Sequence, residues 1–364
     1  RSLLHLKEAS QTITFAHVPE RPVPSLLRGF SAPVILDYPY TEADLLALAA
    51  HDTDDFNRLE AFERLWLATF NTNAAPAPAF MHVLRQALRD VVAGKIDPAL
   101  VAEQFSLPTT EYRLQLTDGI FDLDADDQRR RELYRQVGQA LQAEFQAVLA
   151  KFPAPQPYAP TAAQIGRRRL RTVAFNYLVH TDVAAVAPVL TALYQTADNL
   201  TDRVVAMRLL LDHAPAAAAP ILADFAARNA AEPLNLDTLK LLKASAHTTA
   251  ATAFVEAECQ DPGFDWARVS GVRSVFTGYT MSGVANFHRR DGQGYLLYAH
   301  AMAKAALKND KATARMVKVL TEAYKLDADR VAGLRAALAW LGQQPNLGPA
   351  VREVIQLGLA SENK

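Results

Sequence analysis

The sequence is dominated by a change of hydrophobic periodicity at Pro39. Before this residue apolar and polar side chains alternate, as in a strand; after it apolar residues recur every three to four positions, and this pattern continues to the end of the chain. Residues 39–364 must therefore form helices that bury their apolar stripes against one another. A chain of 364 residues is long enough to build several domains or one extended helical array.

Prolines punctuate the central part of the helical region at Pro188, Pro215, Pro233 and Pro262. They separate helices of about 15–20 residues, so that a helix pair recurs at roughly the period of HEAT or tetratricopeptide repeats. The pattern predicts a mostly α fold, a HEAT-like α-solenoid of about sixteen helices. After a first helix capped by Thr41, the predicted helices are 54–70, 78–92, 98–105, 124–152, 161–180, 182–195, 201–213, 217–228, 235–246, 249–260, 266–276, 295–307, 311–324, 328–342 and 347–359.

Residues 1–38 have a different character. Residues 11–18 and 32–38 are strand candidates because β-branched and aromatic side chains alternate with other residues. Three prolines interrupt the chain between them, and two strands alone do not make a stable domain. We interpret 1–38 as the terminal strands of a β-sandwich and 39–364 as a separate helical domain. Because the chain starts at Arg1, we expect it to be the C-terminal piece of a longer polypeptide.

Charge and composition exclude several classes of partner. There are 38 Lys and Arg against 39 Asp and Glu, whereas a nucleic-acid-binding protein needs a basic surplus. No apolar run reaches the roughly 18–20 residues that span a bilayer, so no membrane partner is expected. The single cysteine, Cys259, cannot form an intramolecular disulfide and suits a reducing compartment. These features predict a cytoplasmic protein.

Catalytic motifs are missing from the sequence. None of the nine histidines belongs to an H-E-x-x-H motif, and no two of them are four residues apart. A zinc hydrolase uses that spacing because it places two ligands on one helix face. The sequence also lacks G-x-S-x-G, and we interpret Asp291–Tyr295 as a turn that starts a helix. We therefore predict no catalytic residue, no metal ligand and no cofactor in this chain.

Arginines are the remaining candidates for a site. We interpret the clusters 129–131 and 167–171 as solvated helix faces. Arg273, between Val272 and Phe276, and Arg315, between Ala312 and Val319, lie instead within apolar stripes. An arginine in that position needs either a carboxylate partner or a ligand, because an unpaired buried charge costs several kcal/mol. The sequence is compatible with both a structural ion pair and a ligand contact.

Several segments occur in a recognisable order along essentially the whole chain. They are Arg21–Val34, Lys95–Leu100, Asn199–Asp202, Val272–Ser274, Phe287–His288 with Asp291–Tyr295, Ala314–Arg315, and Asp327–Ala328 with Arg330. Together they resemble the end of the third domain and the whole fourth domain of the bacterial alanyl aminopeptidase (aminopeptidase N) family of zinc metallopeptidases.

The resemblance implies that 1–38 is the end of an immunoglobulin-like sandwich and that 39–364 caps the active-site chamber. The zinc and its ligands would then lie in an upstream catalytic domain, and this chain alone should be inactive. Its partners would be that domain and a peptide substrate, and the parent enzyme would remove N-terminal residues with broad specificity. Arg273 and Arg315 match arginines on the inner chamber wall, where they would attract peptide carbonyl and carboxylate groups.

A non-enzymatic alternative is an α-solenoid that binds peptides or proteins on its concave face. An upstream H-E-x-x-H motif followed by a glutamate about 18 residues later would favour the enzyme.

Overall fold

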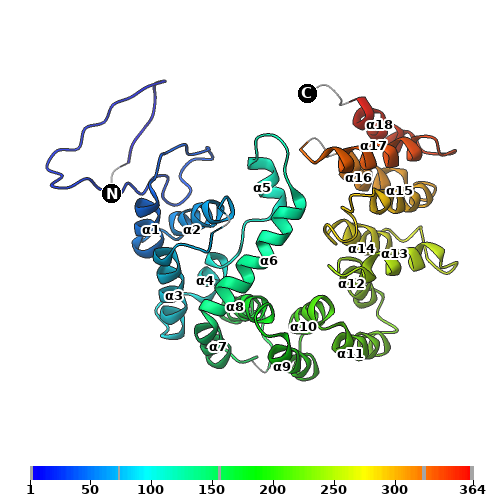
Figure 1. Cartoon of the computed structure of the whole chain (residues 1–364), viewed down its shortest axis with the longest axis horizontal. Coiled ribbons are helices and arrows are strands. Elements are labelled where there is room, and N and C mark those ends of the chain that lie inside the picture. The colour runs from blue at the N-terminus through cyan, green and yellow to red at the C-terminus, as the bar shows by residue number, and fades with distance from the viewer. Residues whose placement is uncertain (1–2, 73, 155–156, 322–324, 361–364) are drawn as a thin grey trace. The chain divides into compact units, whose positions relative to one another are not determined.

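The computed structural model describes residues 3–72, 74–154, 157–321 and 325–360. Within them the chain forms 18 α-helices and one 3₁₀ helix and contains no strand, so the predicted helical class is confirmed (Figure 1). The helices are α1 (Glu42–His51), α2 (Asp55–Phe70), α3 (Pro78–Val92), α4 (Pro98–Gln104), α5 (Thr110–Leu116), α6 (Leu123–Ala140), α7 (Gln142–Lys151), α8 (Ala162–Val179), α9 (Val183–Thr196), α10 (Leu200–His213), α11 (Pro215–Arg228), α12 (Pro233–Ala244), α13 (Ala250–Gln260), α14 (Val269–Thr280), α15 (Gln293–Ala306), α16 (Asp310–Val317), η1 (Lys318–Thr321), α17 (Ala328–Gly342) and α18 (Pro349–Ala360).

Local capping explains where many of these helices begin. At α1 the Thr41 side chain accepts from the Asp44 amide, and the Asp44 carboxylate accepts from the Thr41 amide, which forms a capping box. The same kind of side-chain cap starts α10 at Asn199 and α17 at Asp327. Short polar residues therefore set these helix starts through local hydrogen bonds.

The chain divides into two compact units, residues 1–65 and residues 66–364. In the first unit the segment before α1 is held by side-chain contacts. Arg28 donates to the Asp52 carboxylate at 2.6 Å, and Asn57 donates to the Leu26 carbonyl at 2.8 Å. These contacts attach residues 25–28 to the ends of α1 and α2.

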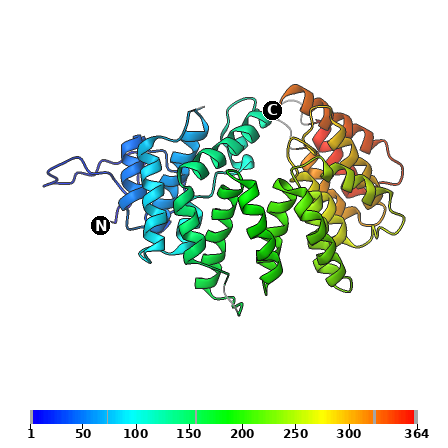
Figure 2. The ribbon, with the colours of Figure 1, turned by 60° about the horizontal axis from the view of Figure 1, so that its bottom comes forward.

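In the second unit successive helices pack as antiparallel neighbours. α10 packs against both α9 and α11, and α12 packs against α13 and α14. Figure 1 shows α9, α11 and α13 on the outer side of the array and α8, α10 and α12 on its inner side, and Figure 2 shows α8 to α12 side by side. The C-terminal part shares a continuous core that includes Phe276, Tyr279, Phe287 and Tyr295. This repeated packing is that of an α-solenoid.

Within the described residues, two differences from the prediction change the number of helices. The predicted helix 124–152 is split into α6 and α7 at Leu141, and α5 was not predicted; these two differences account for 18 helices rather than sixteen. Leu141 has the non-helical angles φ −119° and ψ 22°. Just before it, Gly138 allows α6 to touch the Tyr177 carbonyl of α8, where an added Cβ would lie 2.6 Å from the oxygen. The break therefore coincides with close packing on another helix.

The predicted strands at 11–18 and 32–38 are not formed in the structure. Both segments are largely exposed, and Ile35 keeps 99% of its accessible surface. An extended segment becomes a strand only when a neighbour supplies ladder hydrogen bonds, and the two segments do not supply them to each other.

Candidate functional site

Arg273 and Arg315 lie on α14 and α16, two helices that contact each other. Both side chains are exposed, and within the described residues neither takes part in a hydrogen bond or ion pair. The expectation that they lie inside apolar stripes is therefore wrong. The large buried side chains of α14 are Val272, Val275, Phe276 and Tyr279, and Arg273 falls outside that stripe. The structural ion-pair reading is also excluded, and two exposed guanidinium groups are available to a ligand.

The Asp327–Arg330 segment builds a structural contact instead. The Arg330 side chain keeps only 1% of its accessible surface. Its guanidinium donates to the carboxylates of Asp327 at 2.5 Å and Asp124 at 2.8 Å, and to the His288 carbonyl at 2.7 Å. The hydrogen bond from Arg330 holds the pKa of Asp124 below its usual range. Arg290 also pairs with Asp124 at 2.5 Å. We call these four side chains, Asp124, Arg290, Asp327 and Arg330, the closing junction.

The closing junction joins parts of the second unit that are far apart in sequence. Asp124 lies at the start of α6, 206 residues before Arg330 in α17. Nearby, the Phe121 amide donates to the Lys325 carbonyl at 2.6 Å, and the Lys325 ammonium donates to the Gln115 carbonyl at 2.8 Å. The start of α6 is thus bonded to α17, which closes the array of helices between them. The inner helices α8, α10 and α12 belong to this closed array (Figure 1).

The Phe287–Tyr295 segment is also structural. His288 Nδ1 lies 2.9 Å from the Tyr295 hydroxyl, and burial lowers the pKa of His288 to about 4. Gly294 packs so closely that an added Cβ would lie 2.3 Å from the Asn286 carbonyl oxygen. Asp291 accepts from the Gln293 amide at 3.1 Å, which is the geometry of a turn before α15. The glycines serve packing and turn formation.

The Asn199–Asp202 segment combines a helix cap with a buried ion pair. Asn199 caps α10, and Asp202 accepts from Arg171 of α8 at 2.5 Å with both side chains buried. The interpretation of the arginine clusters as solvated faces is therefore wrong for Arg171, Arg168 and Arg129, which are 3–8% exposed. Arg129 and Arg171 are buried because a backbone carbonyl and a carboxylate from other helices face them, which local sequence does not show. Arg168 donates to Gln164 of its own helix and lies over the Tyr158 ring.

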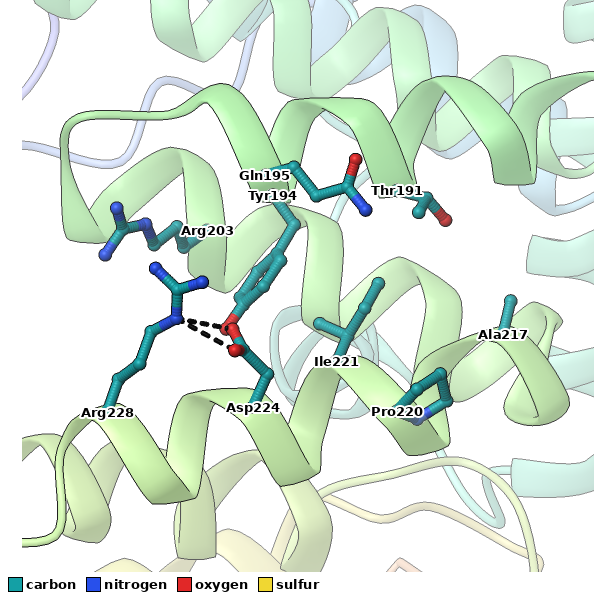
Figure 3. Close-up of a pocket in the computed structure, with 9 residues that line it drawn as sticks. All are labelled: Thr191, Tyr194, Gln195, Arg203, Ala217, Pro220, Ile221, Asp224 and Arg228. Carbon is teal, nitrogen blue, oxygen red and sulfur yellow. Dashed lines mark hydrogen bonds and ion pairs between the residues drawn. The ribbon is translucent and has the colours of Figure 1, made fainter.

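Two pockets lie between helices of the second unit. One, of about 310 Å³, lies between α9 and α11 (Figure 3). The other, of about 430 Å³, lies between α13, α15 and α17 and includes Cys259 and Trp340. Burial raises the pKa of the Cys259 thiol to about 11, so the neutral thiol dominates at pH 7 and is a poor nucleophile. Sequence reasoning identified neither pocket.

No three His, Cys, Asp or Glu side chains among the described residues are arranged to hold a metal ion. The residues that the structure describes therefore do not fit a zinc site, and we assign no chemical step to zinc among them. Over the same residues, no helix is both long enough and apolar enough to cross a membrane.

Comparison with known families gives two adjacent matches. Residues 42–360 match the family described as a domain of unknown function (DUF3458_C) with ARM repeats. Residues 1–39 match a domain of unknown function (DUF3458) with an Ig-like fold.

Known proteins match over nearly the whole chain. The chain is 28% identical to aminopeptidase N of Escherichia coli over 99% of its length and 42% of that protein, and 28% identical to aminopeptidase N of Caulobacter vibrioides over 97% of its length and 41% of that protein. A crystal structure of Legionella pneumophila aminopeptidase A in complex with aspartic acid matches with a TM-score of 0.84 and 25% identity, over 95% of this chain and 41% of that one. The chain thus spans about two fifths of the length of these relatives. It belongs to the DUF3458_C family of ARM-repeat domains and is homologous to the C-terminal region of bacterial aminopeptidase N.

Proposed function

We propose that this chain is the chamber-forming region of a broad-specificity zinc aminopeptidase that removes N-terminal residues from peptides. The observation that carries the proposal is the continuous match to aminopeptidase N over 99% of the chain. In this proposal the zinc and the reacting groups belong to a catalytic domain upstream in the same polypeptide. The helical array contributes a wall that substrates must pass.

The arrangement of the second unit supports this role. The closing junction holds the α6 end of the array against α17, so the inner helices cannot easily spread apart. A wall of fixed geometry around a peptidase site would admit flexible peptides and exclude folded proteins, because only an extended chain can thread a narrow opening. We expect the enzyme to function in peptide catabolism.

Arg273 and Arg315 would act as substrate-channel residues. They are exposed and unpaired within the described residues, so no protein carboxylate has to be displaced before they bind a ligand. A guanidinium group binds carbonyl and carboxylate oxygens through several N–H groups at once. Their expected ligands are the carbonyls and terminal carboxylate of a peptide beyond the scissile bond.

Kinetics of the full-length polypeptide test this role. Arg315→Ala should raise KM for a tetrapeptide at least about tenfold, as expected for a lost charge-assisted contact of about 1.5–3 kcal/mol. It should change KM for alanyl-p-nitroanilide little, since that substrate is too short to reach the helical wall. Arg273→Ala should act in the same direction, whereas Arg89→Ala, which removes an exposed arginine of α3, should have no effect. Equal losses for both substrates would refute the channel role.

The proposal carries further expectations about partners and location. The formal charge of −1 gives no basis for nucleic-acid binding, and we propose no membrane partner. We place the enzyme in the cytoplasm, where a single unpaired cysteine is stable. The non-enzymatic solenoid is not favoured, since the relatives that match the chain along its whole length are aminopeptidases.

A further inference from the structure

The pocket between α9 and α11 has a charged end and an apolar end. Figure 3 shows Arg203 and Arg228 at one end together with Tyr194 and Asp224, and Pro220 at the other. The residues that line the pocket come from α9, α10 and α11. None of them lies on α14 or α16, the helices that carry the proposed channel residues.

The charged end carries one more positive than negative group. Asp224 is the carboxylate there, and it already accepts from the Tyr194 hydroxyl at 2.7 Å and from Arg228 Nε at 2.9 Å. Arg203 uses Nε and one terminal nitrogen to bind the Ala197 carbonyl, at 3.1 and 2.8 Å. No hydrogen bond to a described residue uses the terminal nitrogens of Arg228. The two guanidinium groups therefore keep donors free for one additional anion.

The rest of the pocket suits a small amphipathic body. Ile221 and Pro220 of α11 supply apolar surface, and Gln195 of α9 faces them with an amide group that makes no hydrogen bond to a described residue (Figure 3). A volume of about 310 Å³ is at the lower end of the range for small-molecule sites and is too small for a folded partner. A ligand that extends from the charged end to the apolar end of the pocket would place a carboxylate at the arginines, an amide near Gln195 and a hydrocarbon group on Ile221.

We propose that this pocket binds carboxylate-terminated ligands that carry an amide and an apolar side chain, namely N-acylated amino acids or the C-terminal residue of a peptide. The carboxylate accepts charge-assisted hydrogen bonds from the free terminal nitrogens of Arg203 and Arg228. Burial of the side chain against Ile221 and Pro220 adds apolar contact. The inference does not depend on the proposed aminopeptidase activity.

The seven isoleucines of the chain make a direct test possible, because Ile221 is the only one among the residues that line the pocket. The protein is labelled with ¹³C at the isoleucine δ1 methyl groups and titrated with N-acetyl-L-leucine. The Ile221 signal should shift and saturate with a dissociation constant on the order of 1 mM, while the signals of Ile96 and Ile355 should stay in place. N-acetyl-L-leucinamide, which lacks the carboxylate, should bind at least about tenfold more weakly.

The tripeptide Ala-Ala-Leu distinguishes the two proposed kinds of ligand. Binding shows that the C-terminal residue of a peptide is accepted, and absence of binding restricts the pocket to small acylated amino acids.

Two matched variants check the contact. Arg228→Gln should weaken N-acetyl-L-leucine binding about tenfold, because it removes one guanidinium and leaves the fold intact at an exposed position. Arg131→Gln removes an arginine with the same i,i+4 carboxylate spacing and similar exposure, but on α6, and should change nothing. The proposal fails if Ile221 does not shift at about 20 mM ligand, if the leucinamide binds equally well, or if Arg228→Gln binds as tightly as the unsubstituted protein.

Discussion

Replacing Arg330 with methionine should release the closing junction, and the structure sets the size of the effect. The substitution removes three side-chain hydrogen bonds and leaves two carboxylates without their buried partner. Removal of one member of a buried ion pair costs about 3–5 kcal/mol. Because the Asp124 side chain is 40% exposed and can be solvated, we take the lower end, about 3 kcal/mol.

Amide hydrogen exchange is the appropriate assay, since a repeat array can open locally without unfolding completely. A loss of about 3 kcal/mol should speed exchange in the first turns of α6 and α17 on the order of a hundredfold. Amides in α9 and α11, which contain none of the junction residues, should keep their protection. Arg289→Met, which breaks an exposed pair with Asp291, is the control and should cost less than about 1 kcal/mol.

The milder variant Asp124→Asn keeps the test informative if Arg330→Met does not fold. It should accelerate exchange at the same two turns by a smaller factor, because Arg330 retains Asp327. If neither variant changes exchange at α6 and α17 by more than about threefold, the junction does not hold the array closed.

Two further predictions concern pH and packing. Burial lowers the pKa of His213 to about 4, and its ring contacts that of His180, so the unfolded chain binds more protons than the folded one between pH about 6.5 and about 4. The free energy of unfolding should therefore fall as pH is lowered through that window. In His213→Gln, the difference between the urea midpoints measured at pH 7 and pH 5 should be smaller. An unchanged difference would contradict the role given to His213. Gly138→Ala places a Cβ 2.6 Å from both the Tyr177 carbonyl oxygen and the Thr181 methyl group, and should lower stability by about 1–3 kcal/mol in denaturant titration. Unchanged stability would mean that α6 and α8 can move apart without cost.

Helix boundaries were predictable where their cause is local. Thr41 begins α1 and Asp327 begins α17 through side chains that bond to amides three residues later. The end of α6 was not predictable, because Leu141 favours helices and the contact of Gly138 with Tyr177 is visible only in the folded chain.

The candidate site was only partly predictable for a similar reason. Arg273 was assigned to an apolar stripe of its helix. The side of α14 that is buried depends on how the neighbouring helices orient it about its axis, and in the structure residue 273 lies outside the buried side. Arg330 pairs with Asp327 at i,i+3 spacing, but its other carboxylate partner, Asp124, lies 206 residues away, and no spacing rule connects those two. The pocket between α9 and α11 combines side chains from three helices, none of which has a recognisable motif.

The distance in sequence between Asp124 and Arg330 also matters during synthesis. A ribosome that adds about 5–20 residues per second needs roughly 10–40 s to make the 206 residues that separate them. During that time α6 can pack against its nearest neighbours, while the carboxylate in its first turn still lacks Arg330; its other partner, Arg290, is added 166 residues after Asp124. The closing junction therefore stays incomplete until α17 has left the ribosomal exit tunnel, and the inner surface is more accessible to chaperones and proteases until then.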